Sequence, residues 1–233
     1  MIKAIFFDFG GTIVTEESDK IAHYHIADYI KQKYTIPLSH DEIDRIITHD
    51  LMEAVKTAEN RWPDIYGLIE NSFEKLLKKY GLKVSNEEKE DFSRTYIELH
   101  VQYMELFPDA IETLDLLREN FVGHIGIISD IVDDLIYGVI RKFSLQKYFD
   151  SVTTSEEVGV GKPNPMIFKV ALKKAGANPE SCIYIGNSPR HDVYGAKRVG
   201  MKSILVGKAN SELADFKIQN LKDVLPIIFD GRL

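Results

Sequence analysis

The hydrophobic pattern of the first half of the chain changes from one short apolar run to long stretches at helical spacing. Residues 2–7 are almost entirely apolar and end at Asp8 and two glycines, which is typical of a buried strand entering a tight turn. From residue 16 to residue 106 the spacing predicts four helices, at residues 18–33, 39–59, 65–80 and 85–106. Two of these begin with a serine three positions before a glutamate, the capping-box pattern. This part of the chain is therefore predicted to be all-helical.

Beyond Pro108 the pattern becomes an alternation of short apolar runs and amphipathic stretches. It predicts strands at residues 122–128, 152–154, 182–185 and 203–206, and helices at residues 110–120, 133–142, 165–175 and 191–199. Strands that alternate with helices form a parallel sheet through right-handed crossovers. We therefore predict an α/β core made of residues 1–15 and 107–233, with residues 16–106 as an all-helical insertion.

Composition and charge narrow the class of protein. The 233 residues are 44% hydrophobic and 28% charged, as in soluble globular proteins. The net charge of −7 disfavours a general binder of nucleic acid or of anionic membranes. No apolar run reaches the roughly 20 residues that a membrane span needs. A single cysteine and a start without signal-peptide features lead us to expect a reducing, cytoplasmic location.

Polar residues stand where three of the predicted strands end. In open parallel sheets, ligands bind beyond the carboxyl ends of the strands. Asp8, Ser129 and Asn187 each end a predicted strand, so we expect them to be neighbours in space. A carboxylate at the end of a buried strand is unfavourable unless it has a partner. Taken singly, Asp8 also fits a simple turn and Ser129 a turn that closes a strand.

Two further segments carry charged groups near predicted turns. Lys162 stands between Gly161 and Pro163. It could be an ordinary solvated lysine, or it could bind phosphate or carboxylate oxygens through its positive charge. Asn187 and Asp192 offer the hard oxygen ligands that Mg²⁺ prefers, although the aspartate also fits a helix cap. Together the four segments supply a nucleophile, an anion donor, a cation and metal ligands at the edge of one sheet.

In this combination the chain resembles the haloacid-dehalogenase-like (HAD) hydrolase superfamily. That family has an Asp nucleophile, then a Ser or Thr, then a Lys, and then a pair of acids; Asp8, Ser129, Lys162, and Asn187 with Asp192 occupy these positions. The resemblance implies a Rossmann-like core with a helical cap of the phosphatase type. It also implies a Mg²⁺-dependent phosphatase that acts on a small phosphorylated metabolite through an aspartyl-phosphate.

The same resemblance assigns roles to particular residues. The expected catalytic residues are Asp8, Ser129 and Lys162. The expected substrate-binding residues are Gly11, Thr12, Ser129, Asp130 and Lys162 in the core, with Arg61 and Trp62 from the one break in the cap. The expected metal ligands are Asp8, the backbone carbonyl of Gly10, Asn187 and Asp192.

Two positions depart from the family pattern. Gly10 replaces the second Asp, the usual general acid and base, and Asn187 replaces the first Asp of the last motif. General acid–base help is worth typically 10²–10⁴-fold, so its loss is expected to slow turnover of poor leaving groups most. The residues that could supply the missing proton are Glu16, His23, His25 and His191.

Three other functions remain open at this point. The first is a 2-haloacid dehalogenase, a class that also lacks the second Asp, uses no metal and would have Asp8 attack carbon. Pro189 in the last motif and the absence of an arginine before Arg45 disfavour this function. Arg61 could nevertheless anchor the substrate. A phosphonate hydrolase would need a cap lysine, for which Lys20, Lys31 and Lys33 are available. A non-catalytic binding or regulatory module on the same fold is the third alternative.

Overall fold

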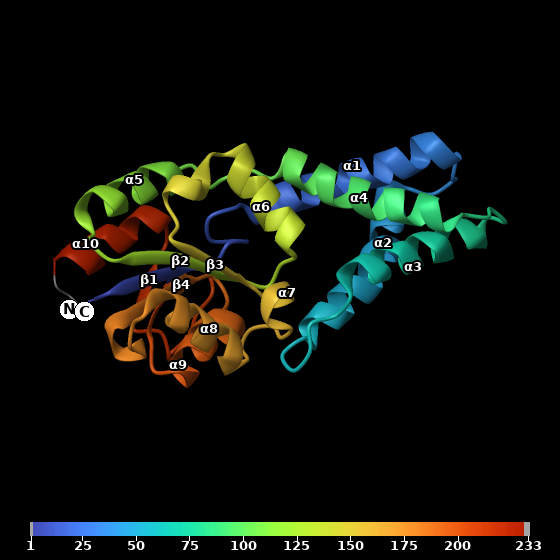
Figure 1. Ribbon diagram of the computed structural model, residues 1–233. Coiled ribbons are helices and arrows are strands. Elements are labelled where there is room, and N and C mark those ends of the chain that lie inside the picture. Colours follow the sequence, from blue (N-terminus) through green and yellow to red (C-terminus); the bar gives the residue numbers. More distant parts are fainter. Residues whose placement is uncertain (1, 231–233) are drawn as a thin grey trace.

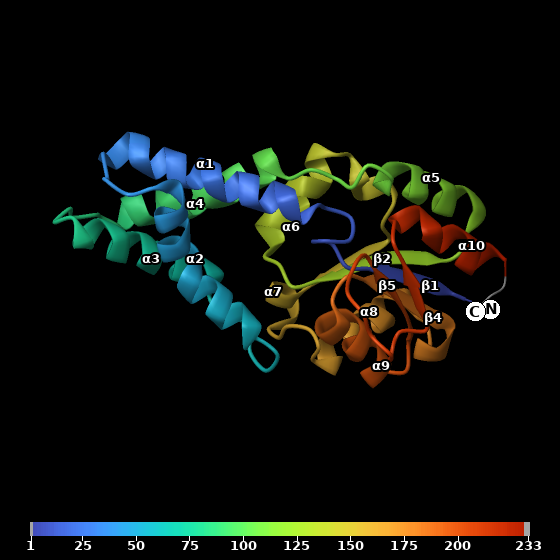
Figure 2. The same cartoon turned by 180° about the vertical axis from the view of Figure 1, so that it is seen from behind.

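A six-stranded parallel sheet forms the centre of the computed structural model, which describes residues 2–230 (Figures 1 and 2). The strands are β1 (Ala4–Phe7), β2 (His124–Ser129), β3 (Ser151–Thr154), β4 (Cys182–Gly186), β5 (Lys202–Val206) and β6 (Phe216–Ile218). Their order is β3-β2-β1-β4-β5-β6, and every neighbouring pair is parallel. The predicted α/β class with a parallel sheet is confirmed.

Helices cover both faces of the sheet and bury its central strand completely (Figure 1). On one face lie α5 (Ala110–Asn120), α6 (Asp133–Lys142) and α10 (Val224–Phe229), and on the other lie α8 (Pro165–Ala175) and α9 (Gly195–Arg198). Successive residues of a strand point to opposite faces. Ile5 and Phe7 accordingly pack into one hydrophobic cluster, and Ala4 and Phe6 into another. Burial on both faces explains why this strand reads as an unbroken apolar run.

The inserted helices form a bundle with a hydrophobic core of its own. They are α1 (Glu16–Tyr34), α2 (His40–Lys56), α3 (Ile65–Lys79) and α4 (Asn86–Tyr103). Phe73 of α3 stacks on Phe92 of α4 with ring centroids 4.0 Å apart. This helical cap, inserted into the sheet core, confirms the predicted fold class, and its exact boundaries at residues 16 and 106 stay a prediction.

Several predicted boundaries were wrong. Helix α1 begins at Glu16 rather than at residue 18, because Thr15 accepts the hydrogen bond from the Ser18 amide and so takes the capping position. Helix α2 ends at Lys56 rather than at residue 59, where the chain turns away to contact the core. Both predicted capping boxes are present at the starts of α2 and α4.

The C-terminal part departs most from the prediction. The segment predicted as a helix over residues 191–199 instead begins at Pro189, runs as a π-helical turn to Tyr194 and continues as α9. Strand β6, the short helix α7 (Ser155–Val158) and helix α10 were not predicted. Elements of three to six residues carry too few positions for a periodic pattern to stand out.

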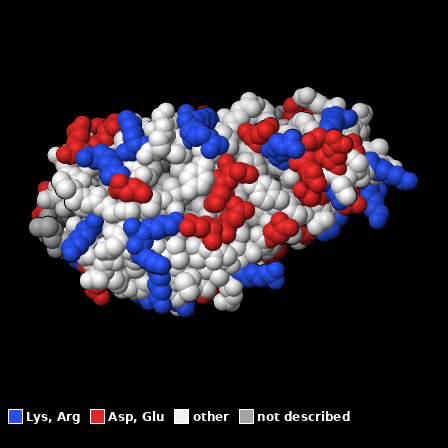
Figure 3. Space-filling view, in the orientation of Figure 1, with Lys and Arg blue, Asp and Glu red and all other residues white. Residues whose placement is uncertain are grey.

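The distribution of charged side chains on the surface is consistent with the net charge of −7. Acidic and basic side chains are interspersed over the face drawn in Figure 3, and the described residues on that face form no continuous basic surface. Within residues 2–230, none of the helices is long and apolar enough to cross a membrane.

The loop between α2 and α3 docks on the core loop that carries Lys162. The Trp62 amide donates to the Gly159 carbonyl at 2.8 Å, and the Gly161 amide donates to the Ala58 carbonyl at 2.8 Å. The carboxylate of Glu59 pairs with Arg198 of α9 at 2.7 Å. Figure 1 shows this loop reaching towards α7 and α8 from the cap. The cap is therefore tied to the core at a point directly beside the candidate site.

This docking makes a testable prediction. We expect Glu59→Ala to weaken the docking of the α2–α3 loop on the core by up to about 1 kcal/mol, which is the upper value for a partly exposed ion pair. This corresponds to about a fivefold change in the docking equilibrium. Amides of residues 57–64 should then exchange faster with deuterium, measured by mass spectrometry. Glu53→Ala is the matched control, because within residues 2–230 the ion pair of the Glu53 carboxylate is with Lys56 of its own helix, at 2.6 Å. Equal exchange in both variants would contradict the role given to Glu59.

Candidate functional site

The predicted motif residues meet where β1, β2 and β4 end. They surround a cavity of about 150 Å³. Its lining residues are Asp8, Gly10, Ser129, Asp130, Lys162, Asn187, Ser188, His191 and Asp192. Because β1 pairs with both β2 and β4, the residues that follow these three strands are brought together, as the sequence predicts.

Lys162 joins the two carboxylates of the site. Its ammonium group donates to Asp8 Oδ1 at 2.7 Å and to Asp192 Oδ1 at 2.7 Å. It also lies 3.0 Å from the hydroxyl of Tyr184. The side chains of Lys162 and of both aspartates are at most 9% exposed. One buried cation thus faces two buried carboxyl groups, so the ionised site carries an excess of negative charge.

This imbalance perturbs the ionisation of the site. Burial and the neighbouring Asp192 raise the pKa of Asp8 to about 7, against the opposing effect of Lys162. Burial alone would lower the pKa of Lys162, but the two aspartates raise it well above its ordinary value. Lys162 therefore stays charged, and a second cation at this point would favour the ionised form of Asp8.

Oxygen ligands for such a cation are present. Asp8, Asp192 and Asn187 all line the cavity. The amide nitrogen of Asn187 donates to Glu16 at 2.9 Å, so its carbonyl oxygen takes no part in that bond. Carboxylate and amide oxygens are the ligands that Mg²⁺ prefers. The donor set therefore fits Mg²⁺, while coordination by the Gly10 carbonyl stays a prediction.

The two glycines after Asp8 have different steric roles. Gly11 has a φ of +71°, and a Cβ there would lie 2.1 Å from the Asn187 amide nitrogen, so only glycine fits. Gly10 is different, because a Cβ built there has no other atom within 4 Å. The absence of the usual Asp at position 10 is therefore not imposed by lack of space.

Four of the predicted substrate-binding residues do not line the cavity around Asp8: Gly11, Thr12, Arg61 and Trp62. Gly11 lines an adjoining cavity of about 280 Å³. Thr12 is fully buried, its hydroxyl has no hydrogen-bond partner among the described residues, and it lines a separate cavity of about 310 Å³. Trp62 lines a cavity of about 160 Å³ under the cap. Arg61 is exposed and lines none of these cavities. Asp130 lies at the site, and its carboxylate accepts from the backbone amide of Lys162 at 2.8 Å.

Sequence reasoning missed Tyr184. Its hydroxyl lies 2.9 Å from the Ile128 carbonyl, 3.0 Å from Lys162 Nζ and 3.1 Å from Asp192 Oδ1. It thus holds the lysine and one carboxylate in place from the middle of β4. The available signal was a hydroxyl-bearing aromatic residue inside an otherwise apolar strand, since a buried Tyr normally hydrogen-bonds its hydroxyl.

The residues considered as replacements for the missing acid lie at different distances from the site. His191 lines the cavity around Asp8. Glu16 lines an adjoining cavity of about 280 Å³ together with Gly10 and Ser129. His25 stacks on Tyr103 of the cap with ring centroids 3.8 Å apart. His23 lies deeper under the cap, in the cavity that Trp62 lines.

Comparison with known proteins agrees with the architecture and the motifs. Residues 5–206 match the model of the haloacid dehalogenase-like hydrolase family. The chain is 26% identical over 238 positions to a glyceraldehyde 3-phosphate phosphatase of Methanopyrus kandleri, covering 98% of this chain and 97% of the relative.

Two solved structures show the same fold. A HAD phosphatase from Thermococcus onnurineus is 28% identical with a TM-score of 0.71, over the full length of both chains. A 2-haloacid dehalogenase from Pseudomonas syringae has a TM-score of 0.77 at 24% identity, and the match covers 99% of this chain and 100% of the other. At this identity the likeness shows a shared fold and not a shared function. With the family model matched over residues 5–206, the chain belongs to the haloacid dehalogenase-like hydrolases.

Proposed function

We propose that the protein is a Mg²⁺-dependent phosphatase of small phosphate esters, with Asp8 as the nucleophile. The observation that carries the proposal is the buried arrangement of Asp8, Lys162 and Asp192 beside a cavity at the sheet edge. Similarity over nearly the whole chain to a glyceraldehyde 3-phosphate phosphatase supports phosphate esters as the substrate class.

In this proposal each residue has a distinct task. Lys162 holds one oxygen of Asp8, which leaves the other oxygen to attack phosphorus in line with the leaving alkoxide. The new bond joins Asp8 to phosphorus, the bond to the alcohol breaks, and water later hydrolyses the aspartyl-phosphate. The hydroxyl of Ser129 hydrogen-bonds the remaining phosphate oxygens, and the charge of Lys162 stabilises the transferring group.

Asp8, Asp192, the amide oxygen of Asn187 and the Gly10 carbonyl would hold Mg²⁺ in this account. When bound, Mg²⁺ offsets the repulsion between the carboxylate and the phosphate and polarises a phosphoryl oxygen. Phosphoryl transfer depends chiefly on such positioning and electrostatics, so a site without its usual acid can still work.

The dehalogenase alternative is less well supported. An arginine that anchors a haloacid carboxylate should lie near the nucleophile, and Arg61 is exposed and does not line the cavity around Asp8. A purely binding module is disfavoured because two buried carboxylates around one lysine are unfavourable without a task.

A substrate panel with and without Mg²⁺ tests the proposal. It contains p-nitrophenyl phosphate, glyceraldehyde 3-phosphate and 2-chloropropionate, assayed for phosphate or chloride release. We expect phosphate release that EDTA abolishes, and a loss of at least about 10³-fold in Asp8→Asn, because the nucleophile is removed. Circular dichroism of the variant serves as the control for folding.

Other outcomes of the panel favour the alternatives. Chloride release that is insensitive to EDTA would indicate a dehalogenase. An absence of turnover by the folded wild-type protein on any ester would favour the binding module. Unchanged phosphate release by Asp8→Asn would exclude Asp8 as the nucleophile.

The open space at Gly10 generates a second prediction. We expect Gly10→Asp to raise turnover of sugar phosphates by about 10²-fold or more, since it restores a proton donor for a poor leaving group. Turnover of p-nitrophenyl phosphate, whose leaving group needs little protonation, should change much less. Gly10→Asn is the matched control without an acid. A variant that gains nothing on sugar phosphates would mean that another residue already supplies the proton.

A further inference from the structure

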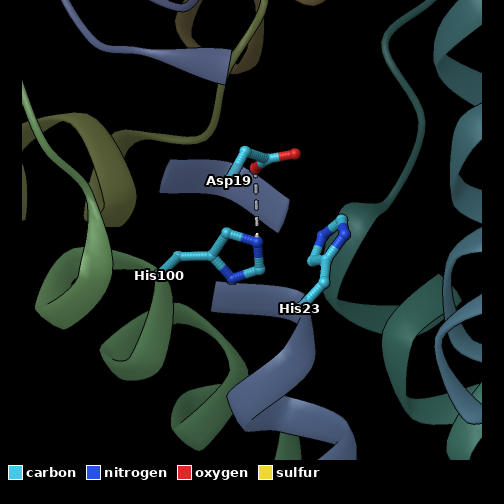
Figure 4. A group of neighbouring side chains, drawn as sticks. All are labelled: Asp19, His23 and His100. Carbon is cyan, nitrogen blue, oxygen red and sulfur yellow. Dashed lines mark ion pairs between the residues drawn. The ribbon is translucent and has the colours of Figure 1, made fainter. Parts of the chain in front are cut away.

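Under the cap lies a second group of potential metal ligands, separate from Asp8. Asp19 and His23 stand four residues apart on α1 and so share one face of that helix. His100 faces them from α4. Each offers a ligand atom, and these atoms all lie within 4.8 Å of one another. Figure 4 shows the three side chains converging, with the pair between Asp19 and His100 dashed.

The hydrogen bonds of His100 leave a lone pair directed at Asp19. Its Nδ1 lies 2.8 Å from the Tyr96 carbonyl, which can only accept, so Nδ1 carries the proton. Its Nε2 lies 3.5 Å from Asp19 Oδ1. In the neutral ring the Nε2 lone pair therefore faces a carboxylate oxygen, a contact that a cation bound between the two atoms would make favourable.

His23 is oriented in the same manner. Its Nδ1 lies 3.3 Å from Asp44 Oδ1, and this carboxylate accepts the ring proton. Its Nε2 lies 3.2 Å from the Tyr96 hydroxyl, and a metal bound to this nitrogen would take the place of that contact. In metal sites, ligating histidines usually donate their other ring nitrogen to a carbonyl or a carboxylate. Both histidines of this group have such a partner, which fixes their tautomers.

We propose that Asp19, His23 and His100 form a binding site for a transition-metal ion of the Zn²⁺ type, distinct from the oxygen-ligand site at Asp8. Two imidazoles and one carboxylate suit Zn²⁺, whereas Mg²⁺ prefers oxygen ligands alone. Tetrahedral coordination needs ligand atoms about 3.3 Å apart. The three side chains therefore have to draw together slightly around the ion.

The surroundings leave a coordination position open. Asp19, His23 and His100 line the cavity of about 160 Å³ under the cap. Asp19 and Asp130 also line the adjoining cavity of about 280 Å³, which Gly10 and Ser129 share. An ion with three protein ligands would keep its fourth position for water or for a ligand in this space. The site thus lies on the cap side of cavities that share lining residues with the one around Asp8. Its existence does not depend on the proposed phosphatase activity.

Calorimetric titration of the EDTA-treated full-length protein with Zn²⁺, in the presence of saturating Mg²⁺, tests the inference. We expect one Zn²⁺ per chain, and Co²⁺ in its place should give the visible absorption of a tetrahedral site. His23→Gln and Asp19→Asn should each weaken binding by about 100-fold, and Asp44→Asn by about 10-fold, as is typical for ligands and their outer partners. These three positions are partly exposed, which avoids relying on the buried His100.

His49→Gln is the control, because the partner of this exposed histidine among the described residues is Asp50 of its own helix. It should bind Zn²⁺ as the wild type does. An absence of stoichiometric Zn²⁺ binding, or binding that His23→Gln and Asp19→Asn leave unchanged, would overturn the inference. Phosphate release is not measured in this experiment, so its outcome is separate from that of the substrate panel.

Discussion

The ammonium group of Lys162 lies between the buried carboxyl groups of Asp8 and Asp192, and the rest of the site is arranged around this contact. Buried carboxylates are unfavourable without such a partner of opposite charge. The lysine is held through its backbone by Asp130 and through its ammonium group by Tyr184. The segments that carry these groups come from four distant parts of the chain, and the parallel sheet brings their ends together.

One lysine does not neutralise two carboxylates, and this shortage of positive charge links the site to its proposed chemistry. Together with burial, the uncompensated charge of Asp192 raises the pKa of Asp8 to about 7. The same shortage explains why a divalent cation would fit between the carboxylates and an incoming phosphate. The docking of residues 57–64 against the loop of Lys162 couples the cap to the same point. Closure of the cap and exclusion of water from Asp8 are therefore expected to occur together.

Much of the fold and of the site could be predicted from the sequence, because both depend on local patterns. Strand β1 is apolar throughout since it is buried on both faces, and Asp8 stands out at its end. The polar residue inside β4 was a signal for Tyr184, but its partners could not be predicted, because only the fold brings its hydroxyl beside Ile128 of β2 and beside Lys162. The group of Asp19, His23 and His100 was equally hidden, since only the packing of α1 against α4 brings its members together. The short β6 and α10 lacked enough residues for a periodic signal.

A crystal structure of the protein with Mg²⁺ and beryllofluoride, a mimic of the phosphoryl group, tests the central claim most directly. The account predicts beryllofluoride attached to the carboxylate oxygen of Asp8 that Lys162 does not hold, with Mg²⁺ bound by Asp8, Asp192 and Asn187. Beryllofluoride and Mg²⁺ that bind elsewhere, or an Asp8 carboxylate that contacts neither of them, would contradict it.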